Sequence, residues 1–293
     1  MTQGAPLRAA FWMIGTITSF TLMAVAGREL GAVHDSFEIM TFRSILGVII
    51  VVVVGYFAGT LGQISRRNLH LHVARNICHF AGQNLWLIAV VSTPLALVFA
   101  LEFTTPIWVT LLAPFFLAER ITRMRAFTAI LGFIGILIVA RPGSGVALTP
   151  GVIAGAAAAI GFAGSVIFTR RLTRTETITC ILFYLTTMQA VFGLICAGYD
   201  GHVTWPTLQT LPLLTAVGVA GLLAHFCLTK ALSIAPATVV MPIDFARLPI
   251  IAIVGMLLYN EPLEWAVLFG AIVIVFSNYI NIRAENRAIA TTV

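Results

Sequence analysis

Seven ionisable side chains lie inside long apolar stretches of the sequence, where a charge is costly unless it is paired or hydrated. They are Arg43, His79, Glu102, His225, Lys230, Asp244 and Arg247. Carboxylates in such surroundings can hold a cationic group or exchange protons, an arginine can hold a carboxylate, and a histidine can relay protons. These residue types are typical of a site that binds a small polar molecule within an apolar body.

Glu102 and Asp244 are the most informative pair. Glu102 follows Pro94 by eight residues and Asp244 follows Pro236 by eight, which places each carboxylate roughly 12 Å along a helix. The two segments are predicted to enter a membrane from opposite sides, so the carboxylates should lie on either side of its midplane. Three prolines lie close to them: Pro106, Pro242 and Pro249. Proline removes a helical N–H donor, and interrupted helices at matching positions favour a binding site there.

A structural role for the same charges is the alternative. Asp244 and Arg247 are three residues apart on one predicted helix and could neutralise each other. Glu102 could be neutralised by Arg43 or by Lys230 in the same way. Lys230 lies near a predicted helix end, from which its side chain could extend to the membrane interface. The sequence leaves both roles open for these residues.

A polar face is predicted on the third apolar segment. Arg75, His79, Gln83 and Trp86 follow one another at spacings of four, four and three residues, so they share one side of a helix. Such a face is typical of a cavity wall, and His79, Gln83 and Trp86 are therefore candidate substrate-binding residues. His79 could equally be held by a neighbouring helix, or it could relay protons.

The composition excludes a water-soluble protein. Of 293 residues, 59% are apolar and only 10% are charged, whereas soluble domains have about 45–50% and about 25%. Apolar runs of roughly 18–25 residues match the length of a helix that crosses a bilayer, and they lack the alternation of barrel strands. The predicted spans are 9–28, 37–58, 71–91, 94–117, 124–141, 150–170, 178–198, 211–232, 236–259 and 263–282. We therefore predict an all-α membrane protein with ten transmembrane helices.

The arginines predict the orientation. Twelve lie in the gaps on one side of the membrane: Arg8, Arg66, Arg67, Arg75, Arg120, Arg123, Arg125, Arg170, Arg171, Arg174, Arg283 and Arg287. Only Arg28 and Arg141 lie on the other side. By the positive-inside rule, both termini face the cytoplasm, in a bacterial inner (plasma) membrane. The net charge of +6 is thus a topology signal and does not indicate a nucleic-acid partner. A cleaved signal peptide at the first span is a less favoured alternative.

Several chemistries lack their usual signatures. The patterns of P-loop ATPases, zinc proteases, serine hydrolases and dinucleotide-binding proteins are absent. The four cysteines are scattered within apolar runs without paired spacing: Cys78, Cys180, Cys196 and Cys227. They are predicted to be small buried hydrophobes. We expect no cofactor, no metal site and no enzymatic activity.

An internal repeat organises the chain. A shift of 142 positions superimposes the halves without a gap, and it aligns Pro94 with Pro236, Arg28 with Arg170, Gly59 with Gly201 and Glu119 with Glu261. The same shift aligns Glu102 with Asp244 and Gln83 with His225, which adds His225 to the candidate site. The predicted repeats are residues 1–145 and 146–293. Each holds five spans, an odd number, so the second must be inverted relative to the first. Two inverted halves around a central cavity are the architecture of secondary transporters.

The most distinctive stretch is AERITRMRAFTAILGFIGILIVARPG at 118–143, with a weaker counterpart, NEPLEWAVLFGAIVIVFSNYI, at 260–280. In each, a Glu at the end of the fourth helix of the repeat precedes a fifth helix that contains glycine. Over nearly its whole length the chain resembles the drug/metabolite transporter superfamily, and within it the EamA-type ten-helix transporters. The resemblance implies transport of a small organic metabolite without ATP. Glu119 and Glu261, at helix ends near water, are predicted to cap or gate rather than to contact the substrate.

Together these features predict a secondary transporter that works by alternating access. Its substrate is expected to be small and amino-acid-like, zwitterionic or amine-bearing, held by Glu102, Asp244, Arg247 and Arg43. A larger metabolite such as S-adenosylmethionine or a vitamin is the alternative, and an intramembrane enzyme is the alternative from another class. Glu102, Asp244 and Lys230 are candidates for coupling, to protons or to a counter-substrate. The sequence does not decide between import and export, or whether the chain forms a homodimer in the lipid bilayer.

Overall fold

The computed structural model describes residues 5–117, 123–140, 149–199, 201–234 and 243–290, and within them the chain is helical apart from short connections. The element order is α1 (Ala5–Leu30), α2 (Ser36–Phe57), the short 3₁₀ helix η1 (Leu61–Gln63), α3 (Leu69–Ser92), α4 (Leu95–Glu102), α5 (Thr105–Leu117), α6 (Arg123–Ala140), α7 (Pro150–Leu172), α8 (Ile178–Cys196), α9 (Leu211–Ile234), α11 (Arg247–Tyr259) and α12 (Trp265–Ala290). The predicted all-α class is confirmed over these residues.

Six stretches of this helical body are long and apolar enough to cross a membrane. They are Leu7–Leu30, Ser36–Phe57, Leu95–Leu112, Pro150–Thr169, Ile178–Cys196 and Leu211–Leu228. Shorter apolar helices occupy Ala126–Val139, Arg247–Tyr259 and Trp265–Asn281. Many large apolar side chains on these helices are exposed at the surface, as lipid-facing positions require.

The fourth predicted span, 94–117, is not one continuous helix. α4 ends at Glu102, Phe103 and Thr104 form a turn, and α5 begins at Thr105. The second half repeats this break at the equivalent positions: Asp244 is helical, Phe245 and Ala246 form a turn, and α11 begins at Arg247. Both acids of the candidate site therefore immediately precede a helix break.

Proline and side-chain hydrogen bonds account for the break. Pro106 and Pro249 lie in the first turn of α5 and of α11, where the missing N–H costs nothing. Thr104 Oγ1 donates to the Leu101 carbonyl at 2.6 Å, and Thr105 Oγ1 donates to the Glu102 carbonyl at 2.7 Å. Asn278 of α12 donates to the Phe103 carbonyl at 2.7 Å. Non-helical backbone is tolerated at membrane depth only when its polar groups are satisfied in this way.

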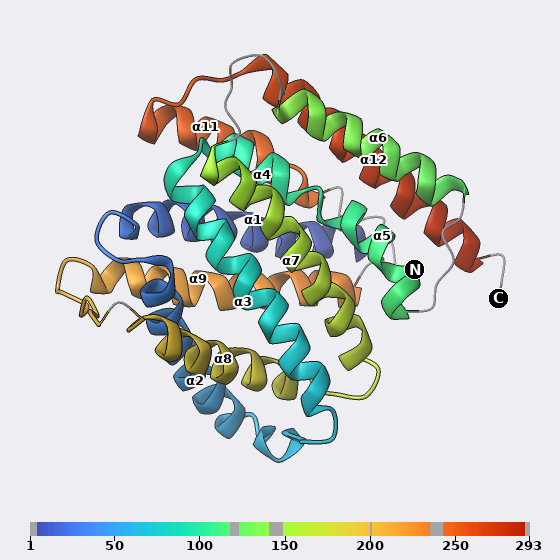
Figure 1. The fold of residues 1–293 in the computed structure, drawn as a ribbon. Helices are drawn as coiled ribbons and strands as arrows, with labels where there is room; N and C mark the ends of the chain where they lie inside the picture. Colours follow the sequence, from blue (N-terminus) through green and yellow to red (C-terminus); the bar gives the residue numbers. More distant parts are fainter. Residues whose placement is uncertain (1–4, 118–122, 141–148, 200, 235–242, 291–293) are drawn as a thin grey trace.

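The helices pack in pairs that each join the two halves of the sequence. Among the described helices, the four most extensive pairs are α3 with α7, α1 with α9, α6 with α12 and α2 with α8. Exchanging the halves leaves this set unchanged, because α1 corresponds to α7, α3 to α9, α2 to α8 and α6 to α12 under the shift. Figure 1 shows α6 and α12 side by side along one edge, and α2 and α8 at the opposite edge.

Two equivalent glycines adopt the same unusual backbone conformation. Gly59 has φ of 66° and Gly201 has φ of 81°, a left-handed region that other residues rarely occupy. Each follows the second helix of its half, α2 or α8. The alignment of Gly59 with Gly201 thus reflects a shared turn geometry.

Close packing of α3 on α7 yields a stability prediction. A Cβ atom on Gly161 would lie 2.8 Å from Gly82 Cα and 3.0 Å from the Cys78 carbonyl oxygen, both of which are backbone atoms. Gly161→Ala should therefore force the helices apart and destabilise the protein by about 1–3 kcal/mol. The measurement is the apparent melting temperature in detergent. Gly62→Ala is the matched control, because a Cβ there meets no atom within 4 Å, and an equal melting temperature for the two variants would contradict the prediction.

Candidate substrate-binding site

Glu102, Asp244 and Arg247 meet at the two helix breaks. Arg247 Nη2 donates to Glu102 Oε1 at 3.0 Å and to Asp244 Oδ2 at 3.3 Å. The other Glu102 oxygen, Oε2, accepts from Trp86 Nε1 of α3 at 2.8 Å. The Arg247 and Asp244 side chains are buried, and the Glu102 side chain is 18% exposed. We call these three ionisable residues the central triad.

Aromatic rings surround the guanidinium of the triad. Arg247 Cζ lies 4.7 Å from the ring centre of Phe20, 5.0 Å from that of Phe99 and 5.1 Å from that of Phe103. Phe103 also packs edge-to-face against Phe245 with ring centres 5.4 Å apart. These rings exclude water and add cation–π attraction, which strengthens the electrostatic interactions inside the triad.

The triad has one more acid than base. Two carboxylates and one guanidinium sum to a formal charge of −1 when all three are ionised. Asp244 Oδ1 and Arg247 Nε are buried without a hydrogen-bond partner among the described residues. A buried site with unbalanced negative charge and free bonding capacity is suited to a cationic group or to a proton.

Arg43, His79 and His225 form a second group. They line a small cavity of about 20 Å³ between α2, α3, α8 and α9, together with Gln189 and Thr186. The ring centres of His79 and His225 are 6.3 Å apart. Phe20 connects this group to the central triad, since its ring contacts His225 at 5.5 Å and also lies against Arg247. A cavity of this size has room for about one water molecule.

The predicted pairing of Glu102 with Arg43 or Lys230 is corrected by these contacts. Arg247 is its ionic partner, because the helix breaks bring the end of α4 to the start of α11. Arg43 lies instead in the cavity with the histidines. Lys230 is exposed near the C-terminal end of α9, which suits a side chain that extends to the membrane surface.

The polar face of α3 is buried, and it contacts both the central triad and the cavity with the histidines. Trp86 bonds to the central triad, and His79 faces the cavity. Gln83, between them on the helix, is buried, and its Nε2 has no hydrogen-bond partner among the described residues. Arg75 is bonded to Thr169 Oγ1 of α7 at 3.0 Å.

Glu261 joins three helix ends on the side of the molecule predicted to be external. It forms an ion pair with Arg28 of α1, and its Oε2 accepts from Leu95 N, the first N–H of α4, at 2.8 Å. Arg28 also donates to the Val90 carbonyl at 2.6 Å and lies over the Tyr259 ring at 4.6 Å. The carboxylate thus caps α4 and ties it to α1. Glu119, its counterpart in the first half, lies outside the described residues, as do Pro236, Pro242 and Arg141.

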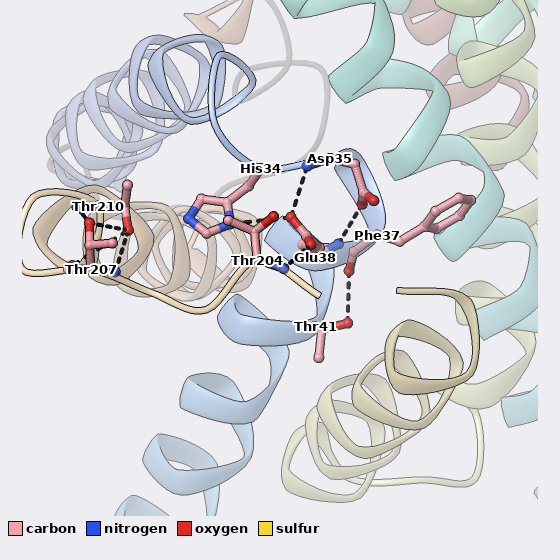
Figure 2. A network of polar contacts seen from close by, with 8 residues as sticks. All are labelled: His34, Asp35, Phe37, Glu38, Thr41, Thr204, Thr207 and Thr210. Atoms are coloured by element: carbon pink, nitrogen blue, oxygen red, sulfur yellow. Dashed lines mark hydrogen bonds and ion pairs between the residues drawn. The ribbon is translucent and has the colours of Figure 1, made fainter. Parts of the chain in front are cut away.

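A second polar network, centred on Glu38, lies at the same end of the molecule. Figure 2 shows the buried Glu38 carboxylate between His34, Asp35 and Thr204. Glu38 Oε2 accepts from Asp35 N at 3.1 Å, Asp35 Oδ1 accepts from Glu38 N at 2.8 Å, and Glu38 Oε1 accepts from Thr204 N at 2.5 Å. His34 Nδ1 lies 3.3 Å from Glu38 Oε2. The network holds the α1–α2 turn of the first half to the α8–α9 connection of the second.

Sequence reasoning missed several residues of these groups. Phe20, Phe99 and Phe103 resemble any other apolar residue of a spanning helix, so no sequence signal marks them. Asn278 and Gln189 carried a signal, because an amide inside an apolar run needs a partner. Both are buried and bonded across helices: Gln189 Nε2 donates to the Asn76 carbonyl at 2.9 Å.

Comparison with known proteins gives consistent results. The profile of the EamA-like transporter family matches residues 7–141 and again residues 149–283. An S-adenosylmethionine uptake transporter of Rickettsia bellii is 30% identical over 281 residues, which cover 95% of this chain and 94% of that protein. A riboflavin transporter of Brucella anthropi is 35% identical over 204 residues, or 68% of this chain and 72% of that protein.

A more distant relative and a solved structure extend this similarity. A pseudopaline exporter of Pseudomonas aeruginosa is 26% identical over 265 residues, covering 90% of this chain and 92% of that protein. A protein of known crystal structure shares the fold with a TM-score of 0.66 at 17% identity, over 96% of this chain and 98% of that one.

The family match covers both halves of the sequence, and the helices that the structure describes are long and apolar enough to span a membrane. The resemblance to EamA-type transporters is thereby confirmed, and an enzymatic role is not supported. The chain belongs to the EamA-like transporter family and is a multi-pass membrane transporter of small metabolites.

Proposed function

We propose that the chain is a secondary transporter of ten spans, built as two inverted repeats, 1–145 and 146–293, that move about the central triad. The helix pairing that is unchanged on exchange of the halves supports this arrangement. So does the contact of Phe103 with Phe245, because residues at equivalent positions touch where a two-fold axis passes. Both breaks in the spanning helices lie at this point, as in transporters whose discontinuous helices form the binding site.

The substrate proposed is a metabolite that carries a cationic centre, with S-adenosylmethionine as the leading compound. The observation that carries this is the excess carboxylate of the central triad, enclosed by aromatic rings. A sulfonium or ammonium group is attracted both to a carboxylate and to ring faces. Relatives named as S-adenosylmethionine uptake transporters match nearly the whole chain. The smaller amino-acid-like substrates predicted from the sequence have the same ammonium and carboxylate groups as S-adenosylmethionine. They are therefore included in the uptake test.

Uptake into proteoliposomes tests the substrate. Radiolabelled S-adenosylmethionine, riboflavin and a panel of amino acids are each offered to purified protein, with and without a pH gradient and with internal unlabelled substrate. We expect saturable uptake of S-adenosylmethionine, at least about tenfold above that of riboflavin. Stimulation by a pH gradient would indicate proton coupling through the triad, and stimulation by internal substrate would indicate exchange. Saturable uptake of riboflavin alone would contradict the proposed substrate class.

Alternating access requires gates at both membrane faces, and the Arg28–Glu261 pair is proposed as the external one. It links α1 and α4 of the first half to the α11–α12 connection of the second. Because the shift aligns Arg28 with Arg170 and Glu261 with Glu119, Arg170 and Glu119 are the sequence positions from which a counterpart at the internal face is proposed. The cavity beside the histidines is smaller than any metabolite, so a substrate can reach it only when the helices separate.

A further inference from the structure

Three side chains with metal-ligating atoms meet at the end of the molecule opposite the Arg28–Glu261 pair. They are His72 in the first turn of α3, Glu176 just before α8, and Cys180 in the first turn of α8. Their ligand atoms all lie within 4.8 Å of one another, and His72 Nε2 is 3.9 Å from Cys180 Sγ. Neither the substrate site nor the proposed gate uses these residues.

The spacing suits a tetrahedral metal ion. Bonds of about 2.3 Å to sulfur and about 2.0 Å to nitrogen at a tetrahedral angle place the two ligand atoms about 3.5 Å apart. Small rotations of the two side chains would bring Nε2 and Sγ from 3.9 Å to that separation. A water molecule or a second carboxylate oxygen would complete the coordination.

Charge and burial favour an ion of this kind. His72 and Cys180 are both fully buried, and Glu176 is partly exposed, which gives an ion access from the adjacent surface. A thiolate and a carboxylate together balance the two charges of a divalent cation, so the loaded site is electrically neutral. The thiolate and imidazole ligands favour zinc and similar metals over magnesium or calcium.

Neighbouring groups orient the ligands. Asn68 Nδ2 donates to Glu176 Oε1 at 2.7 Å, and the backbone N–H of Ser65 donates to Cys180 Sγ at 3.4 Å. The His72 ring packs on Tyr184 with ring centres 4.4 Å apart, and its Nδ1 has no hydrogen-bond partner among the described residues. The imidazole is therefore fixed by packing, which leaves Nε2 directed at the thiol. Outer hydrogen bonds such as those from Asn68 and Ser65 hold metal ligands in place.

We propose that His72, Glu176 and Cys180 form a binding site for a divalent cation of the zinc type. The site was not expected from the sequence, because its ligands have no metal-binding spacing and lie on segments far apart in the chain. It joins α3 of the first half to α8 of the second, so a bound ion would hold the two halves together at the end predicted to face the cytoplasm.

The test is zinc binding to the purified protein, prepared without a histidine tag and titrated in competition with a chromophoric chelator. We expect one zinc ion per chain, with the affinity reduced at least tenfold in Cys180→Ser and in Glu176→Gln. Cys227→Ser is the matched control, since Cys227 is also buried but lies away from this group. Cadmium should give a thiolate-to-metal absorption band in the wild type and in Cys227→Ser but not in Cys180→Ser.

Two results would overturn the proposal. One is a wild-type protein that binds no stoichiometric zinc. The other is zinc binding of equal affinity in the wild type and in Glu176→Gln, a variant at a partly exposed position that should fold normally. If Cys180→Ser fails to fold, Glu176→Gln and the cadmium spectrum of the wild type decide the matter. Because the readout is binding in detergent, it does not depend on whether the transport substrate has been identified.

Discussion

Glu102→Gln is expected to reduce the initial rate of substrate uptake roughly 10- to 100-fold. The substitution removes the excess negative charge of the central triad and replaces a charge-assisted hydrogen bond from Arg247 with a neutral one, and such bonds contribute about 1.5–3 kcal/mol. The ion pair of Asp244 with Arg247 remains, so the site becomes formally neutral. The measurement is uptake into proteoliposomes that contain equal amounts of inserted protein.

Two further variants separate binding from folding. Asp244→Asn makes the same change of charge on the other half of the molecule, and a comparable loss is expected. Glu29→Gln is the matched control, since this exposed carboxylate at the end of α1 accepts only a peripheral bond from Tyr259 among the described contacts, and its uptake should stay within about twofold of the wild type. Normal uptake by both triad variants would show that these charges are purely structural.

Arg28→Gln is expected to open the external face and to lower uptake about tenfold. The Arg28–Glu261 pair is largely buried, with each side chain 13% exposed, so breaking it leaves Glu261 without its charged partner in a low-dielectric position. A crevice of about 160 Å³ lies beside it, lined by Ala96, Thr93 and Pro262 among others. In a cysteine-free background, Ala96→Cys should react several-fold faster with a membrane-impermeant thiol reagent when Arg28 is replaced.

A control position makes the gating result specific. Leu208→Cys lies on the exposed connection between α8 and α9, on the same predicted external side, and its labelling should not respond to Arg28→Gln. A parallel increase at both positions would indicate general unfolding. An unchanged rate at Ala96→Cys together with unchanged uptake would eliminate the pair as a gate.

The helical segments of the described residues were predictable because they depend on local sequence. Apolar runs bounded by short polar gaps set the helix limits to within a few residues, as for α2 and α8. The break after Glu102 could be predicted only in part. Pro106 indicated an irregular helix, but the turn also depends on a hydrogen bond from Asn278, which lies on a helix far along the chain. Tertiary contacts of that kind leave no periodic signal.

In the candidate site, too, contacts between residues close in sequence could be predicted and contacts between distant residues could not. The proximity of Asp244 to Arg247 follows from their three-residue spacing, whereas the bond between Glu102 and Arg247 joins residues 145 positions apart. The aromatic rings around Arg247 could not be predicted from the sequence, because phenylalanine is common on apolar helices. Glu261 was predicted to lie at a helix end, but its ion pair with Arg28, 233 positions away, had no signal in the sequence.

The central claim, that an excess carboxylate in an aromatic enclosure selects a cationic centre, is tested most directly by equilibrium binding. S-adenosylmethionine is compared with the same compound lacking the sulfonium methyl group, whose sulfur is neutral. We predict that the wild type binds the sulfonium compound at least about tenfold more tightly, and that Glu102→Gln removes most of this preference. Equal affinity of the wild type for the two compounds would contradict the account.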